Sequence, residues 1–300
     1  MTKARAKAPS LPEKPVVEEL KFRSENAYLC LLVNRRNKLV RVIDFRAGAL
    51  PAKRLFIQSV AKQEDIQKVI TLVEKDEVSS WTRVGFVREG TIPGFYKRSD
   101  GHLCGCVVGD KTASIEVTEA TQRLAEKTIN AARKGQKDVP EKIKGATAEE
   151  IDEESALELR DAAVAKNKQY EAFDAFGRDA ARLYYKVTMK GAKDNVISAE
   201  YQDCFGHALI EILHYPDTEK DVLATTHGVR ELGENLKERG IVAAFAFAAV
   251  DDVPMATVFT GAGYRKTGLL ALGVQSGKER KDAILWTRKL ANPGGDELEE

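Results

Sequence analysis

The sequence lacks the features that define several classes of protein. It has four cysteines in 300 residues, a formal net charge of only +1, and no apolar run of the roughly 18 residues that a membrane span requires. So few, irregularly spaced cysteines cannot form a disulfide framework in a chain of this size, and we expect a reducing, cytoplasmic setting. The near-zero charge gives no electrostatic reason to expect binding to nucleic acid or to a membrane. A glycine-rich phosphate loop of the P-loop or dinucleotide-binding type is also missing.

What the sequence does contain is one motif that occurs twice. An aromatic residue is followed at fixed spacing by glycine, an aromatic residue and glycine, first as Trp81, Gly85, Phe86 and Gly90, and later as Phe259, Gly263, Tyr264 and Gly268. Each copy is typical of the end of a helix, a glycine in a left-handed conformation and the start of a strand. A second strand is expected after each copy, at His102–Val108 and Ala283–Leu290. We therefore predict two similar units that pack together, each covering an edge of the other.

The first α/β unit is predicted over residues 20–111. Residues 1–19 are basic but have no apolar core behind them, which indicates a disordered arm rather than a signal peptide. Within the unit, apolar runs and their spacing predict strands and one helix. The strands are expected at Ala27–Val33, Leu39–Phe45 and Arg54–Val60, and the helix at Glu64–Asp76.

A helix and a polar linker are expected over residues 112–154, followed by a second unit over 155–291 and an acidic tail over 292–300. The linker helix is predicted from Thr118 to Lys134, ending at Gly135. A capping-box pattern at Ser155 predicts a long helix that reaches about Lys186. The remaining elements are expected as strands at Asn195–Tyr201, His207–His214 and Val242–Val250, and helices at Ala224–Arg239 and Val253–Thr260.

This order of elements resembles the GCN5-related N-acetyltransferase superfamily. More narrowly, VGFVREGTIPGFY at Val84–Tyr96 resembles a segment of the beta-lysine N-acetyltransferases, and the C-terminal match consists of Met255, Phe259, Gly263, Tyr264, Gly268 and Trp286. The resemblance implies an α/β (α+β) fold of two acetyltransferase-like mixed-sheet units with flanking helices, the N-terminal one truncated. It also implies acyl-CoA-dependent transfer of an acetyl group to a small amine, either lysine-like or polyamine-like.

Acetyl-CoA is the cofactor that the resemblance implies. The superfamily holds its pyrophosphate on a glycine-containing turn that enters a helix, where backbone N–H groups are free. The corresponding turn here has no glycine between Gly206 and Gly228, and it carries Asp217, Glu219 and Asp221, which favour the helix N-terminus itself. The motif is therefore degenerate. The residues expected to offer N–H groups to the cofactor are Leu223, Ala224, Thr225 and Thr226.

Glu211 is the candidate general base, because burial in its apolar strand would raise its pKa towards the useful range. The alternative is that it faces solvent or pairs with a lysine or arginine. His214 and Tyr215, at the end of the same strand, are further candidates for proton transfer. Phe259 stands where many members of the superfamily place a tyrosine that protonates the departing thiolate, and phenylalanine cannot do so.

Glu89, Phe95 and Tyr96 are the candidate substrate-binding residues of the N-terminal motif. A carboxylate suits a cationic amine, and two aromatic rings can flank a pocket. The alternative is a hairpin that packs on the second unit. His102, Cys104 and Cys106 alternate, so a strand would direct all three to one face, but a fourth ligand is not evident and no metal site is assigned.

Two functions stay open on this sequence. One is an N-acetyltransferase with a small amine as its partner. The other is a catalytically inactive pseudo-acetyltransferase that uses the fold for protein binding or regulation. A homodimer is compatible with both, and the turn over residues 215–226 is the feature that distinguishes them.

Overall fold

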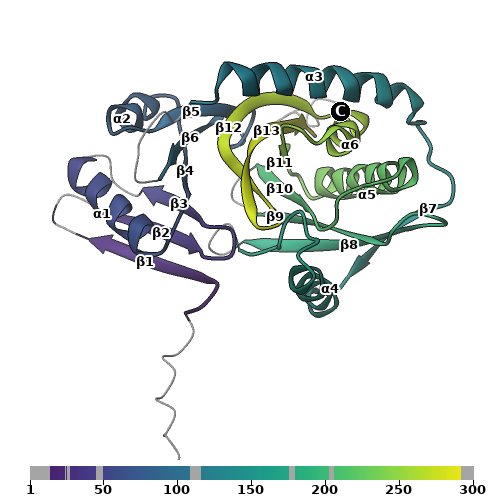
Figure 1. The fold of residues 1–300 in the computed structure, drawn as a ribbon, viewed down its shortest axis with the longest axis horizontal. Coiled ribbons are helices and arrows are strands. Elements are labelled where there is room, and N and C mark those ends of the chain that lie inside the picture. Colours follow the sequence, from purple (N-terminus) through teal and green to yellow (C-terminus); the bar gives the residue numbers. More distant parts are fainter. Residues whose placement is uncertain are drawn as a thin grey trace, which may run out of the picture.

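The computed structural model describes residues 14–23, 25, 28–44, 50–108, 116–175, 180–202 and 206–291. Within them, a mixed sheet of 13 strands runs the length of the molecule, and helices flank it (Figure 1). The strand order is β1-β2-β3-β4-β6-β5-β12-β13-β11-β10-β9-β8-β7. None of the described helices is both long and apolar enough to cross a membrane.

The strands are β1 (Val17–Arg23), β2 (Tyr28–Asn34), β3 (Leu39–Asp44), β4 (Lys68–Val73), β5 (Val87–Ile92), β6 (Gly101–Val107), β7 (Ala146–Ile151), β8 (Ala181–Met189), β9 (Asn195–Tyr201), β10 (His207–Ile212), β11 (Ala243–Ala249), β12 (Arg265–Ser276) and β13 (Glu279–Lys289). The helices are α1 (Leu50–Gln63), α2 (Val78–Arg83), α3 (Glu119–Gly135), α4 (Glu153–Ala165), α5 (Glu219–Glu238) and α6 (Val253–Gly261), with a short 3₁₀ helix, η1 (Gln136–Asp138).

The sheet is built from one order of elements used twice. The first unit is β1-β2-β3-α1-β4-α2-β5-β6, and the second repeats it as β8-β9-β10-α5-β11-α6-β12-β13. In each unit the strand before the longer helix is parallel to the strand after it, and the other neighbours are antiparallel. The second unit also has β7 and α4, which have no counterpart among the described residues of the first. The predicted α+β fold, two similar mixed-sheet units with flanking helices, is confirmed.

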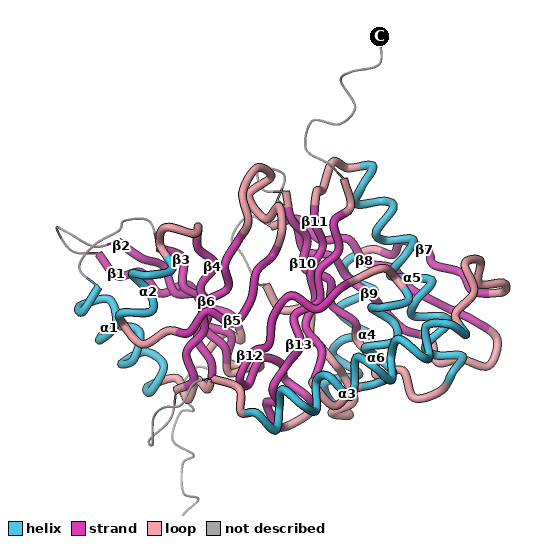
Figure 2. Tube along the Cα trace, turned by 90° about the horizontal axis from the view of Figure 1, so that it is seen from above, coloured by secondary structure: helices cyan, strands magenta, loops and turns pink. Residues whose placement is uncertain are grey.

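The two units join where β5 pairs with β12, at Gly90 and Gly268 (Figure 2). Immediately before each glycine the register shifts by one residue, between Arg88 and Gly90 in the first unit and between Lys266 and Gly268 in the second. The glycines of the repeated motif therefore form the seam of a continuous sheet. The prediction that each unit covers an edge of the other is confirmed.

Three predicted elements are wrong. Residues 54–60 lie in α1 rather than a strand, and residues 64–76 contain β4 rather than a helix. The long helix expected over 155–186 ends at Ala165, and β8 begins at Ala181. Between them Asn167 and Phe173 have φ of 53° and 54°, in the left-handed region that a right-handed helix excludes.

The other predicted elements are present, with shifted ends. The helix expected to begin at Ala224 begins at Glu219, because the side chain of Thr218 caps it. Part of the expected polar linker is ordered as β7, an edge strand whose charged side chains discourage pairing with another chain. Residues 1–13, Phe45, Cys204 and the tail 292–300 lie outside the described residues. The domain limits stay a prediction.

Candidate ligand site

A gap opens in the sheet between β10 and β11. The two parallel strands pair from His207 with Ala243 to Leu209 with Phe245, and the pairing stops there. Tyr170, which is 2% exposed, spans the gap at the far ends of the strands. Its backbone N–H donates to Leu213 O at 2.5 Å, and its hydroxyl accepts the N–H of Ala249 at 2.6 Å. The segment after α4 thus satisfies backbone groups that the divergence of the strands leaves unpaired.

Side chains of the protein itself make hydrogen bonds at the N-terminus of α5. Thr218 and Asp221 form a capping box, and the Asp221 carboxylate accepts the backbone N–H groups of Lys193 at 2.7 Å, Thr218 at 3.0 Å and Asp217 at 3.2 Å. Burial opposes ionisation, but these hydrogen bonds hold the pKa of Asp221 below its usual value. A buried carboxylate therefore already occupies the anion position at this helix terminus.

The residues present do not fit an acyl-CoA. A larger cavity, of about 440 Å³, lies at the N-termini of α5 and α6, and the charged residues that line it are Asp138, Asp217 and Glu219, all acidic. Leu223 and the three residues after it lie inside α5, where helix geometry commits their N–H groups to carbonyls four residues earlier. The acidic side chains that line the cavity, and the Asp221 carboxylate at the helix terminus, would both repel a negatively charged pyrophosphate.

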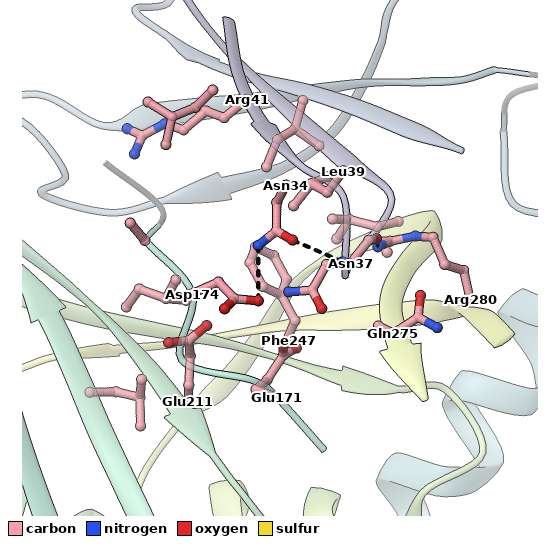
Figure 3. A pocket seen from close by; sticks show the side chains of 17 residues that line it. Asn34, Asn37, Leu39, Arg41, Glu171, Asp174, Glu211, Phe247, Gln275 and Arg280 are labelled. Atoms are coloured by element: carbon pink, nitrogen blue, oxygen red, sulfur yellow. Dashed lines mark hydrogen bonds between the residues drawn. The ribbon is translucent and has the colours of Figure 1, made fainter. Parts of the chain in front are cut away.

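A smaller cavity, of about 50 Å³, lies between the two units (Figure 3). Its walls come from the β2–β3 hairpin, β4, the segment after α4, β10, β11, the bulged part of β12 and β13. Its polar and charged lining residues are Asn34, Asn37, Arg41, Glu171, Asp174, Glu211, Gln275 and Arg280. In Figure 3 Asp174 and Glu211 lie to the left, and Gln275 and Arg280 to the right. Both units therefore contribute polar side chains to one cavity.

Glu211 lies in β10 and faces this cavity, as the sequence suggested for a buried carboxylate. The guanidinium of Arg182 donates hydrogen bonds to two carboxylates, that of Glu211 at 2.8 Å and that of Glu200. Burial raises the pKa of Glu211 to about 7. The positive charge of Arg182 opposes this shift, and the negative charge of Glu200 adds to it. Glu211 is thus paired with an arginine and can still exchange a proton near neutral pH.

Glu171 and Arg280 are charged groups of the cavity that the sequence analysis missed. Arg280 donates through Nε to Leu272 O at 2.8 Å and through Nη1 to Asn37 O, while its Nη2 has no hydrogen-bond partner within the described part of the chain. Burial lowers the pKa of Arg280 to about 10. Burial and the negative charge of Glu211 raise the pKa of Glu171 well above its usual value. The spacing of glycines and aromatic residues does not indicate these two residues, because they lie far apart in the sequence and only the folded chain brings them to one cavity.

His214 and Tyr215 lie beside the gap rather than in the cavity. His214 forms an isolated bridge with Gln169, and burial lowers its pKa. The Tyr215 hydroxyl lies 2.5 Å from Ser276 Oγ, and its ring meets Tyr170 edge to face. Burial raises the pKa of Tyr215 to about 12. The structure therefore brings these two residues to Tyr170 and separates them from the cavity lining.

The three N-terminal candidates pack at the junction of the units. Glu89 forms a buried ion pair with Lys68 at 2.5 Å and accepts the N–H of Ala271. Phe95 stacks on His207 with ring centroids 3.6 Å apart, and the Tyr96 hydroxyl donates to Leu72 O. None of the three lines the small cavity, and their role in substrate binding stays a hypothesis.

The alternating His102, Cys104 and Cys106 do lie in one strand, β6. Cys104 belongs to the hydrophobic core of the first unit, and His102 lies 3.3 Å from the hydroxyl of Thr91. Across the described part of the chain, no group of three potential ligands is arranged to hold a metal ion.

No protein-family model matches the sequence, and no curated protein matches it. Solved structures with some likeness include the spermidine N-acetyltransferase of Vibrio cholerae in complex with CoA and spermine, at 10% identity over 50% of this chain and 98% of that one, with a TM-score of 0.38. A candidate acetyltransferase of Sphaerobacter thermophilus aligns at 12% identity over 48% and 92%, with a TM-score of 0.34. A candidate phosphinothricin N-acetyltransferase aligns at 16% over 49% and 99%, with a TM-score of 0.37.

Proposed function

We propose that this chain is a catalytically inactive member of the acetyltransferase-like folds, serving as a binding or regulatory module. The observation that carries the proposal is the buried Asp221 carboxylate in the first turn of α5, which accepts the backbone N–H groups of Asp217 and Thr218, just before the helix, and of Lys193. A pyrophosphate at this place would have to displace a buried anion that is already hydrogen-bonded. Tyr170 adds a second obstacle, because it spans the gap between β10 and β11.

Direct titration of the full chain with acetyl-CoA tests this proposal. We expect no saturable heat and no rise in melting temperature at millimolar acetyl-CoA or CoA, because acidic groups line the cavity at this helix terminus. Saturable binding in the micromolar range would overturn the proposal. The outcome is independent of any amine, since the cofactor alone is titrated.

The second candidate is an N-acetyltransferase acting on a small amine, with Glu211 as the proton acceptor. It is favoured by one observation: burial raises the pKa of the Glu211 carboxyl to about 7, beside a polar cavity. Lysine, beta-lysine and spermidine are the acceptors that the sequence resemblance and its amine chemistry suggest. Time-dependent appearance of an acetylated amine by mass spectrometry, lost in Glu211→Gln, would favour this candidate over the first.

A further inference from the structure

The small cavity between the units contains buried polar atoms that the protein leaves unsatisfied. Gln275 and Arg280 are 9% and 8% exposed, and Gln275 Oε1 and Arg280 Nη2 find no hydrogen-bond partner among the residues that the structure describes. The other polar atoms of both side chains are used, by Gly277 O for Gln275 and by Leu272 O and Asn37 O for Arg280. An unsatisfied buried donor or acceptor is costly, and a guanidinium donor most of all. The cavity therefore offers one strong donor and one acceptor to a ligand.

The opposite wall is acidic. Asp174 is paired, with Asn34 at 3.3 Å and Arg36 at 3.6 Å, and Glu211 is paired with Arg182. Glu171 differs from them, because its carboxyl forms no ion pair with any described residue. Burial and the neighbouring Glu211 charge act against its ionised form, and the charge of Arg280 offsets this only in part. A positively charged ligand group beside Glu171 would relieve this repulsion.

We infer that this cavity binds a small zwitterion, with the carboxylate of the ligand on Arg280 and its ammonium group between Glu171 and Gln275. A volume of about 50 Å³ accommodates about three to five water-sized groups, which matches an amino acid as small as glycine. Glu171 and Arg280 both belong to the second unit, and the first unit closes the cavity with the β2–β3 hairpin, where Asn37 O accepts from Arg280. The inference names a ligand for the proposed binding function, and it does not depend on the exclusion of acyl-CoA.

Calorimetric titration of the full chain with glycine, acetate and methylamine tests the inference without any substitution. Acetate and methylamine each carry one of the two charges, so we expect glycine to bind saturably and each half-ligand to bind at least about tenfold more weakly. Equal binding of acetate and glycine would identify an anion site and overturn the inference. No saturable binding of glycine, alanine or β-alanine at 10 mM would show that the cavity holds water only, which also overturns it.

Variants then assign the two ends of the ligand. Glu171→Gln keeps the shape of the side chain and removes the carboxyl group that could ionise beside the ammonium group of the ligand, so we expect glycine to bind about tenfold to a hundredfold more weakly. Arg280→Lys replaces the forked donor and is expected to weaken binding similarly. Glu231→Gln, on the half-exposed side of α5, is the matched control and should leave the dissociation constant unchanged. Unchanged glycine binding in Glu171→Gln would overturn the assignment. The glycine titration and the acetyl-CoA titration use different ligands, so this inference and the proposed function can fail separately.

Discussion

Gly90 and Gly268 occupy the same position in the two repeated motifs, and they face each other across the seam between β5 and β12. A Cβ on Gly268 would lie 2.4 Å from Glu89 O and 2.6 Å from the Cα of Gly90. Both obstacles are backbone atoms, so rotation of a side chain cannot relieve the contact. The seam of the sheet thus depends on two residues without side chains.

Gly268→Ala is therefore expected to destabilise the protein by about 1–3 kcal/mol or more, because the strands must separate to admit a methyl group. Chemical denaturation measures the free energy of unfolding. Gly135→Ala is the control, since its Cβ would meet only the side chain of Thr257, at 3.3 Å, and should change stability by less than about 1 kcal/mol. Equal stability of both variants would contradict the seam as a close backbone contact.

Lys68 and Glu89 form an ion pair close to this seam, with Lys68 0% exposed. Burial lowers the pKa of Lys68 and raises that of Glu89, while each charge counteracts the effect on the other. Lys68→Met leaves the Glu89 carboxyl unpaired, so we expect a loss of about 3–5 kcal/mol. The double variant Lys68→Met/Glu89→Gln should recover part of that loss in denaturation experiments. Strictly additive effects would show that the two groups do not interact.

The repeated motif allowed the architecture to be predicted because its physical cause is local. Gly85 and Gly263 have φ of 90° and 84°, values that glycine adopts easily and other residues do not. By contrast, β4 was predicted as a helix because Ile66, Val69, Ile70 and Val73 also fit a helical period. A strand that is covered on both faces shows no alternation that would distinguish it from a helix.

The candidate site could be predicted only in part. Glu211 stood out as a lone carboxylate in an apolar strand, and the structure buries it in a polar cavity. The partners of that cavity did not stand out, because Glu171 and Arg280 look like ordinary surface charges in the sequence. Their burial follows from the docking of the two units, which no local pattern encodes. Tyr170 was assigned to a long helix, and its role depends on that helix ending at Ala165.

His207 makes stability depend on pH. Its Nδ1 lies 3.1 Å from Phe95 O and its ring stacks on Phe95, and burial lowers its pKa to about 3. The unfolded chain gains a proton below about pH 6.5 while the folded one stays neutral, so stability is lost as pH falls from about 6.5 towards 3. One such group contributes a slope of up to about 1.4 kcal/mol per pH unit. Denaturation of wild type and His207→Phe between pH 8 and 5 measures it. An unchanged slope in the variant would contradict this origin.

Asp221→Ala removes the internal anion of α5 and leaves three backbone N–H groups without their acceptor. We expect a loss of about 1–3 kcal/mol, part of which sulfate restores because it can occupy the vacated helix terminus. Glu219→Ala, in the same turn, is the control and should cost at most about 1 kcal/mol. Thermal melting with and without sulfate measures both. If sulfate does not stabilise Asp221→Ala, the N-terminus of α5 does not bind an anion in place of the Asp221 carboxylate.

Tyr170→Phe keeps the aromatic ring that meets Tyr215 and removes the hydroxyl that accepts the N–H of Ala249. Ala249 is buried, so its N–H loses its partner, and we expect a loss of about 1–3 kcal/mol in the free energy of unfolding. Tyr184→Phe is the control, because the Tyr184 hydroxyl lies 3.4 Å from Glu153 in a half-buried contact and should matter less.

Tyr170→Ala separates the two proposed functions, since it opens the gap between β10 and β11 without changing the N-terminus of α5. If Tyr170 alone excluded the cofactor, acetyl-CoA would bind this variant and not the wild type. We expect neither protein to bind it, because the Asp221 carboxylate and the acidic rim remain in place. Titration of Tyr170→Ala, and then of Tyr170→Ala/Asp221→Ala, measures this. Binding by the single variant would mean that Tyr170 alone prevents acetyl-CoA from entering a site that can otherwise bind it. Binding that appears only in the double variant would assign the exclusion to the internal anion.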